Sequence, residues 1–229
     1  MDRLVREGKR LMTLLIAIDG PSGSGKSTTA KLLARRLDLA YLDTGALYRA
    51  ATTEYLRRFP DGGSPEDASA LVAGCDLVVG TSPDAPSFRI NGTDVTDEVR
   101  EPRISAAVSQ IATNLEVRRL LTELMRRIID EHGRRIVVEG RDITTVVAPD
   151  ADVRVLLVAD PQARVARRAA EVAGRASAAE VTDQVLRRDR DDSTVSNFTE
   201  AAEGVEVIDS TWLSPDEVVA RIVALVAPQ

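Results

Sequence analysis

The stretch from Gly20 to Ser27 constrains this chain more than any other. It has the phosphate-loop pattern Gly20-x-x-x-x-Gly25-Lys26-Ser27 and directly follows an apolar run, Leu14 to Ile18, that predicts a strand buried on both faces. Glycines 20, 23 and 25 permit the positive φ with which successive N–H groups wrap phosphate oxygens. A helix starting near Lys26, amphipathic from Thr28 to Leu37, adds the partial positive charge of its N-terminus. Strand, loop and helix together predict a phosphate site rather than a plain glycine-rich turn.

Two side chains of this loop have expected chemical roles. Lys26 is expected to reach the β- and γ-phosphates of a bound nucleotide, and Ser27 is expected to ligate Mg²⁺. The sequence therefore predicts an enzyme or binding module that uses a nucleoside triphosphate.

Composition limits the other classes of function. A net charge of −6 over 229 residues argues against binding a nucleic-acid polymer or an anionic membrane. The single cysteine, Cys75, excludes an internal disulfide and a cysteine metal cluster, and the lone His132 precedes Gly133 at a predicted helix end. No apolar run approaches about 18 residues, and residues 1–11 lack the apolar core of a signal peptide. We therefore expect a cytoplasmic protein in which residues 1–12 are an extension.

Strands that alternate with helices predict an α/β fold. Besides Leu14–Ile18, strands are expected at Ala40–Leu42, Ile136–Glu139, Val153–Ala159 and Val205–Ile208. This alternation predicts a five-stranded parallel sheet flanked by helices. Ligands bind at the carboxyl ends of such strands, where the phosphate loop, Asp43, the segment 139–142 and Asp160 are expected to meet.

A different pattern interrupts this alternation between residues 61 and 132. Short strands are expected at Asp76–Val79, Phe88–Ile90 and Thr93–Val95, the last two joined by an Asn91-Gly92 turn. Helices are expected at Pro102–Ile111 and Leu115–Glu131. We expect residues 61–132 to form an insertion with a small antiparallel sheet. Residues 13–60 and 133–229 would form the core, with a helical lid at about residues 174–195.

Four stretches of the chain resemble one family, the bacterial cytidylate kinases, which are nucleoside monophosphate kinases. They are IDGPSGSGKST, LDTGALYR, NGTDVTDEVR with VSQIA, and VVEGRDITTVV followed by PDA. The phosphate loop is common to many kinases, whereas the other three stretches, in this order, are specific to the family. The resemblance implies a kinase that transfers the γ-phosphoryl group of ATP to CMP or dCMP with Mg²⁺, in pyrimidine nucleotide salvage. We expect it to act as a monomer.

The same resemblance implies the substrate and catalytic residues. For ATP they are Gly20, Pro21, Ser22, Gly23, Ser24, Gly25, Lys26, Ser27 and Thr28, and for CMP they are Thr44, Arg49, Ser109, Arg118, Arg141, Asp142, Arg188 and Asp192. The catalytic set is Lys26, Arg141, Asp142 and Arg188, and Arg100 is a weaker candidate. Arginines suit this chemistry because their planar forks bind phosphate bidentately and stay charged. Glu139 has two possible roles at this point: it contacts Mg²⁺ through water, or it is a purely structural acid.

The predicted lid departs from the family pattern. The family often continues Asp-Ser-Thr-Arg, whereas Asp192-Ser193-Thr194 is followed here by Val195. We expect most arginines between residues 164 and 192 to form a solvated face. Arg188 and Asp192 are four residues apart and so share a helix face, which we expect to turn toward the nucleotide.

Two other interpretations compete with a cytidylate kinase. The first is another small-molecule kinase on the same core, acting on uridylate, adenylate or shikimate, and the insertion and the Ser109 region argue against it. The second is a GTPase or an ATP-dependent binding module. The sequence has no Asn-Lys-x-Asp stretch to read guanine, and its arginine-rich lid is typical of a kinase.

Overall fold

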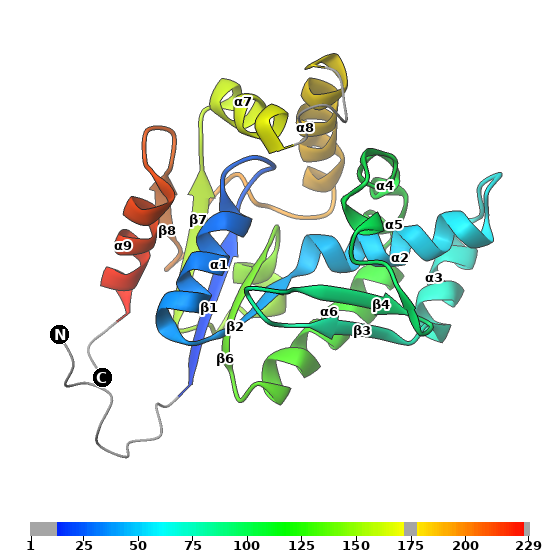
Figure 1. Ribbon diagram of the computed structural model, residues 1–229, viewed down its shortest axis with the longest axis horizontal. Coiled ribbons are helices and arrows are strands. Elements are labelled where there is room, and N and C mark those ends of the chain that lie inside the picture. The colour runs from blue at the N-terminus through cyan, green and yellow to red at the C-terminus, as the bar shows by residue number, and fades with distance from the viewer. Residues whose placement is uncertain (1–12, 172–177, 227–229) are drawn as a thin grey trace.

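A parallel sheet forms the centre of the molecule (Figure 1). The computed structural model describes residues 13–171 and 178–226. The sheet consists, in spatial order, of β2 (Ala40–Asp43), β6 (Arg135–Gly140), β1 (Leu14–Asp19), β7 (Val153–Val158) and β8 (Glu206–Asp209). All neighbouring strands in it are parallel. The predicted five-stranded parallel sheet is confirmed, and the strand ends differ from the expected ones by one residue.

Helices cover both faces of this sheet (Figure 1). On one face, α1 (Lys26–Leu37) and α9 (Pro215–Leu225) share a core with Ile16 and Ile18. On the other face, α2 (Thr44–Arg58), α3 (Pro65–Gly74) and α6 (Leu115–Glu131) share a core with Leu15 and Ala17. Successive strand residues point to opposite faces, so the apolar run of β1 supplies both cores. This double burial is why β1 has no polar side chain before Asp19.

The smaller sheet packs against α2. Its strands β3 (Leu77–Gly80), β4 (Ser87–Ile90) and β5 (Thr93–Asp94) are antiparallel, as predicted. Asn91 and Gly92 both have positive φ, 50° and 79°, which a tight two-residue hairpin requires. Phe88 and Ile90 share a small apolar cluster with Ala46 and Ala50 of α2. The insertion therefore rests on the helix whose first turn faces the carboxyl edge of the large sheet.

One predicted helix is divided in two. The expected helix Pro102–Ile111 is α4 (Pro102–Ala107) followed by α5 (Ser109–Ala112), after a short 3₁₀ turn, η1 (Glu98–Arg100). The break lies at Val108, whose carbonyl accepts from the amides of Ile111 at 3.0 Å and Ala112 at 2.8 Å. The Val108 side chain is buried in the core that it shares with α6. Val108 itself keeps helical dihedral angles, with φ of −59° and ψ of −30°.

A π-helix, η2 (Ile143–Val147), follows Asp142, and the sequence pattern did not predict it. The amide of Ala148 donates to the carbonyl of Ile143 at 2.8 Å, five residues back. π-helices are rare and often lie at functional sites. This one directly follows the Arg141-Asp142 pair at the end of β6.

Two helices lie beyond the carboxyl edge of the sheet, α7 (Pro161–Glu171) and α8 (Ala178–Ser193) (Figure 1). Ser177-x-x-Glu180 has the sequence pattern of a capping box, but Ser177 lies outside the described residues. A capping box begins α9: the Ser214 side chain accepts from the Glu217 amide, and the Glu217 side chain accepts from the Ser214 amide. Within residues 13–171 and 178–226, no helix is long and apolar enough to cross a membrane.

Candidate active site

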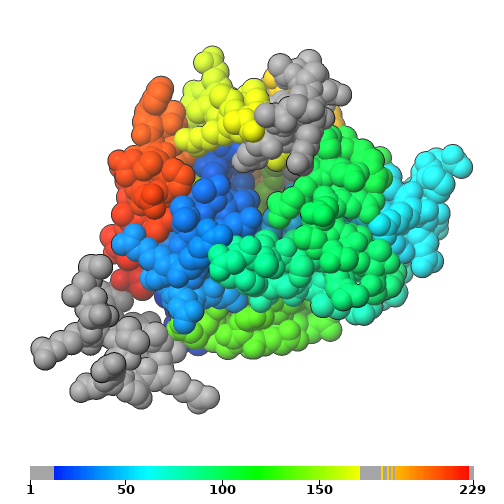
Figure 2. Space-filling model, viewed as in Figure 1, coloured from blue at the N-terminus to red at the C-terminus, as the bar shows by residue number. Residues whose placement is uncertain are grey.

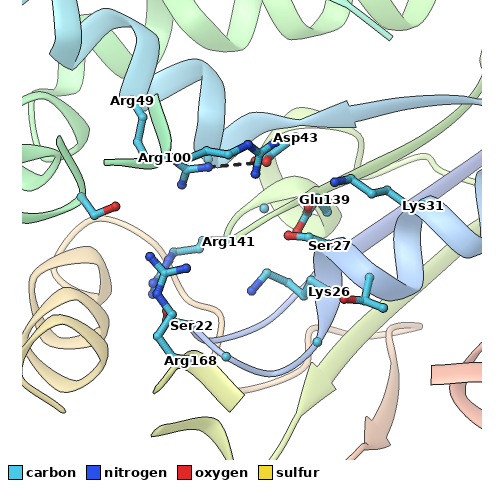
Figure 3. A pocket seen from close by; sticks show the side chains of 16 residues that line it. Ser22, Lys26, Ser27, Lys31, Asp43, Arg49, Arg100, Glu139, Arg141 and Arg168 are labelled. Carbon is cyan, nitrogen blue, oxygen red and sulfur yellow. Dashed lines mark hydrogen bonds and ion pairs between the residues drawn. The ribbon is translucent and has the colours of Figure 1, made fainter. Parts of the chain in front are cut away.

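A cleft of about 340 Å³ opens at the carboxyl edge of the large sheet (Figure 3). It lies where the phosphate loop, the start of α2, the end of β6 and α7 come together, and Figure 2 shows the surface hollowed between α1 in blue and α4 in green. Its basic lining residues are Lys26, Lys31, Arg49, Arg100, Arg141 and Arg168. Its acidic lining residues are Asp43 and Glu139. A cleft with six basic and two acidic side chains is suited to anionic ligands, since the excess positive charge offsets the charge of phosphates.

The phosphate loop is shaped by its glycines. Gly23 and Gly25 have φ of 76° and 92°. A Cβ at Gly23 would also lie 2.5 Å from the carbonyl oxygen of Arg164, so the loop can pass α7 only with glycine there. The Lys26 Nζ donates to the carbonyl of Pro21 at 2.8 Å, across the mouth of the loop. The loop has the form that the sequence predicts, and Lys26 lies over it (Figure 3).

Two carboxylates meet at the strand ends beside Ser27. Asp43 of β2 and Glu139 of β6 are partners in the sheet register, and both are buried. The Tyr41 hydroxyl donates to Glu139 Oε1 at 2.6 Å, and Asp43 caps α2 by accepting from the Ala46 amide at 2.7 Å. Burial raises the pKa of Glu139 and the charge of Asp43 adds to this, while Lys26 opposes it. These carboxylates and the Ser27 hydroxyl are hard oxygen ligands of the kind that Mg²⁺ prefers.

A second, smaller cavity of about 40 Å³ adjoins the cleft. Gly45, Gly140 and Arg141 line both. The smaller cavity is also lined by Thr44, Tyr48, Val108, Ala112, Arg118, Asp142 and Asp192. The structure thus brings together Thr44, Arg118, Arg141, Asp142 and Asp192, five of the residues expected to bind CMP. Arg49 lies in the adjoining cleft, where its Nη2 is 3.5 Å from Asp43 Oδ2.

Arg118 and Asp142 form the polar wall of this cavity. The two side chains are ion-paired, and Arg118 Nη1 also donates to the carbonyl of Ala112 at 2.9 Å. The guanidinium carbon lies 5.8 Å from the centre of the Tyr48 ring, within the range of a cation–π contact. Arg118 is therefore held in place on three sides before any ligand binds.

Ser109 differs from the other expected residues. It begins α5 and lines neither of these two cavities within the described part of the chain. Its Oγ is nevertheless buried and has no hydrogen-bond partner among the described residues, as is also true of Asp192 Oδ1. Buried polar atoms without partners are rare, so both atoms are suited to a ligand's polar groups.

Asp189 of α8 binds three segments of the site at once. Its Oδ1 accepts from the Ser22 amide at 3.0 Å and lies 2.7 Å from Arg141 Nη1, and its Oδ2 pairs with Arg164. Burial alone would raise the pKa of Asp189, but Arg141, Ser22 and Arg164 hold it below its ordinary value. The Asp189 carboxylate therefore occupies hydrogen-bond donors of Ser22, Arg141 and Arg164 that would otherwise be available to a phosphate oxygen.

Arg141 is also held from two further directions, by Asp192 of α8 and by Phe198 in the segment after α8. Its Nε lies 2.8 Å from Asp192 Oδ2, and its guanidinium carbon lies 4.4 Å from the centre of the Phe198 ring. The predicted placement of Asp192 toward the site is consistent with these contacts. The backbone of Arg188 lies in α8, but its side chain is outside the described residues, as are the side chains of some of its neighbours.

Two arginines of α7 do not belong to the solvated face that was expected for most arginines between residues 164 and 192. Arg164 is buried, with only 8% of its surface exposed, and donates to the carbonyl of Ser22 at 3.0 Å. Arg167 donates to the carbonyl of Ser210 at 2.6 Å, which ties α7 to the loop after β8. Tertiary contacts with backbone carbonyls place these side chains inward, and no periodicity in the sequence distinguishes them from solvated arginines.

Several residues of the site were not singled out from the sequence. Asp189, Lys31 and Arg168 are the clearest of them, and Arg100 was only a weak candidate. A signal existed for Asp189, which lies three residues before Asp192 and so shares its helix face. For Lys31 and Arg168 the sequence offers no comparable signal.

Comparison with known proteins agrees with this geometry. A family described as "Cytidylate kinase" matches residues 16–228. A protein of Cutibacterium acnes named cytidylate kinase is 53% identical over 214 residues, which cover 93% of this chain and 96% of the relative. A cytidylate kinase of Rhodococcus opacus is 43% identical over 220 residues, 94% of this chain and 95% of its own. An uncharacterized protein from Eubacterium ventriosum has a related fold, with a TM-score of 0.52 at 10% identity over 95% of this chain and 100% of its own.

Proposed function

This chain belongs to the cytidylate kinase family, and on that premise we propose that it transfers the γ-phosphoryl group of ATP to CMP or dCMP. A phosphate oxygen of CMP attacks the γ-phosphorus, the bond to the β,γ-bridging oxygen breaks, and the products are ADP and CDP or dCDP. The observation that carries the proposal is the pair of adjoining cavities, one at the phosphate loop and one at Arg118 and Asp142, with Arg141 in the lining of both.

Two anionic substrates must approach each other in this reaction, so the main task of the site is to neutralise charge and to position the reacting groups. We assign the donor phosphates to the loop residues 20–28, with Lys26 directed at the β- and γ-phosphates. Arg141 is suited to the acceptor phosphate because it lines both cavities. Arg49 and Arg188 are further proposed contacts of CMP, and Lys26, Arg141, Asp142 and Arg188 form the proposed catalytic set.

The small cavity supports the assignment of the nucleoside. Asp142 and Asp192 place acceptor oxygens there, and the buried Ser109 hydroxyl lies in the neighbouring helix α5. Acceptors of this kind suit the amino group of cytosine and the hydroxyls of the sugar. With uracil, which has a carbonyl in place of that amino group, acceptors would face an acceptor, and such mismatches are costly when buried.

Mg²⁺ is proposed to bind where the oxygen ligands gather. Ser27 would hold it directly, and Glu139, beside Asp43, would contact it through water. When bound, Mg²⁺ would supply positive charge that offsets the negative charge of the donor phosphates.

The domain division also stays a proposal. The segments 13–60 and 133–229 would form the core, 61–132 the acceptor-side insertion, and about 174–195 the lid. We also propose a monomeric enzyme, and the cytoplasm is proposed because it contains both ATP and CMP.

The test is the rate of ADP formation with ATP and each of CMP, dCMP, UMP and AMP. We expect kcat/KM to be higher for CMP and dCMP than for UMP or AMP by on the order of 10²-fold or more, since the unmatched bases leave buried polar groups unpaired. Equal kcat/KM for UMP or AMP would contradict cytidylate specificity. ATP hydrolysis that no acceptor stimulates would contradict a kinase altogether.

A further inference from the structure

Asp19 is a buried carboxylate that lines neither cavity of the described structure. It is the last residue of β1, and only 1% of its surface is exposed. It accepts from the amide of Ile143 at 2.8 Å, the amide of Thr144 at 2.8 Å and the hydroxyl of Thr144 at 2.6 Å. All three donors belong to η2, so one carboxylate anchors the first turn of the π-helix.

The backbone of the same residue holds the other side of this segment. Asp19 is paired in the parallel register with Gly140, the last residue of β6. Arg141 and Asp142 lie between Gly140 and the two anchored residues. A single residue of β1 therefore restrains both ends of the two-residue segment that carries the proposed acceptor-binding side chains.

Asp19 also adjoins the donor side of the site. The next residue, Gly20, begins the phosphate loop, and a Cβ there would lie 2.1 Å from the carbonyl of Leu157 in β7. The phosphate loop thus leaves the sheet at a tightly packed point. Asp19 is where the segment for the donor phosphates and the segment for the acceptor meet.

We infer that Asp19 is a positioning residue, which sets Arg141 and Asp142 in register with the phosphate loop so that the two substrates meet in line. This inference rests on the proposed phosphoryl transfer. Burying a carboxylate is costly, and three hydrogen bonds to one segment offset that cost only while the segment keeps this position. Reactions that depend on the position of their substrates are sensitive to small displacements, and a shift of about 1 Å can cost about 10²-fold in rate.

Asp19→Asn is the first test. The amide has nearly the same shape, but its NH₂ would face an N–H or O–H donor of Ile143 or Thr144. We expect the KM for CMP to rise and kcat to fall, with a combined loss in kcat/KM of roughly 10- to 100-fold. The dissociation constant of ATP, measured by calorimetry without CMP, should stay within about twofold, because the backbone of the phosphate loop is unchanged.

Asp152→Asn is the matched control at the other end of β1. Asp152 Oδ2 accepts from the Leu15 amide at 2.7 Å, so it also anchors this strand, but far from the cleft. Its substitution should leave the KM for CMP unchanged. A purely structural role for Asp19 would give a lower melting temperature in both variants without a selective effect on CMP, and that result would overturn the inference. Equal weakening of ATP and CMP binding would overturn it too.

Thr144 offers an independent test that remains informative if Asp19→Asn does not fold. Thr144→Val removes one of the three donors and keeps the buried shape, and kcat/KM for CMP should fall about 2- to 10-fold. Thr144→Ser keeps the hydroxyl and should restore wild-type values. Wild-type kinetics in Thr144→Val would count against the inference. The proposed function is tested separately, by whether the wild-type enzyme turns over CMP at all. The variants test only the inference, because their kcat/KM values are compared with the wild-type value.

Discussion

Lys26 illustrates how one side chain can serve chemistry rather than folding. Its Nζ donates to the Pro21 carbonyl and lines the cleft, and it is not part of the apolar cores. Lys26→Ala should therefore leave the free energy of unfolding nearly unchanged. It should lower kcat by about 10²- to 10³-fold, as expected for removing a donor that stabilises transition-state charge. Denaturation curves and steady-state kinetics on the same preparation check both parts, and a folded variant with wild-type kcat would remove Lys26 from the mechanism.

Asp19 leads to a prediction about pH. Burial raises its pKa to about 6, with hydrogen bonds from Thr144 and Ile143 opposing the shift and the charge of Asp142 adding to it. The folded state therefore holds this proton more tightly than the unfolded chain, in which the pKa is near 3.8. The contribution of Asp19 to stability is full below pH ~4 and is lost as the pH rises through about 6, by on the order of 3 kcal/mol at about 1.4 kcal/mol per pKa unit.

Activity should have the opposite pH dependence, because the ionised carboxylate is the form that accepts all three donors. We expect kcat/KM for CMP to fall as the pH drops through about 6. The phosphate of CMP also titrates near pH ~6, so Asp19→Asn is the necessary comparison. The ratio of wild-type to variant kcat/KM cancels the titration of CMP and should decrease toward acid pH. A ratio that is constant from about pH 5 to about pH 7, roughly one pKa unit either side of the expected midpoint, would contradict this assignment.

At the scale of elements, Asp189 fastens α8 to the phosphate loop, to Arg141 and to Arg164. Asp189→Ala would leave Arg141 and Arg164 without this partner, and breaking a buried pair in this way costs about 3 kcal/mol or more. The phosphates of ATP and CMP can supply the missing negative charge. We therefore expect the drop in melting temperature to be large in the free enzyme and much smaller with both nucleotides bound.

Asp191→Ala is the control for this experiment. Asp191 pairs with Arg187 four residues earlier on the same helix, and both side chains are about one-third exposed. Such pairs contribute about 0.3–0.5 kcal/mol, so the melting temperature should change little, with or without nucleotides. Equal effects of the two substitutions would contradict the role of Asp189 in attaching α8 to the site.

The arginines of the same helix lead to a second prediction. Arg188 shares a face with Asp192, which contacts Arg141, whereas Arg190 is exposed. Arg188→Ala should lower kcat by on the order of 10²-fold, and Arg190→Ala should stay within a few-fold of wild type. Val195 replaces an arginine common in the family, so fewer cations remain to compensate. Saturating kinetics would distinguish the two, and a larger effect at Arg190 would mean that the opposite helix face meets the substrate.

At the scale of the whole molecule, the two substrates should stabilise the fold separately. CMP at 100 times its dissociation constant should raise the free energy of unfolding by about 2.7 kcal/mol, because it binds only the folded chain. Lys26→Ala should weaken the stabilisation by ATP and leave that by CMP intact, since CMP is assigned to the adjoining cavity. Thermal denaturation with each nucleotide alone measures both. Loss of the CMP effect in this variant would mean that the two sites are not separate.

The sequence by itself determined the sheet, the phosphate loop and the small hairpin, because each depends on local patterns. A doubly buried strand must be apolar throughout, a phosphate loop needs glycines at fixed spacing, and a tight hairpin needs residues such as Asn91 and Gly92 that tolerate positive φ. The motif residues around Thr44, Arg118 and Arg141 were found through family resemblance, and the fold then placed them around adjoining cavities.

Only the tertiary structure decided what depends on residues far apart in the chain. The three donors that meet Asp19 lie more than 120 residues away, and Asp189 meets the Ser22 amide across 167 residues. The inward direction of Arg164 likewise follows from a distant partner, the carbonyl of Ser22. Local periodicity carries no information about such partners, because a buried charge is stable only where the folded chain brings donors or opposite charges to it.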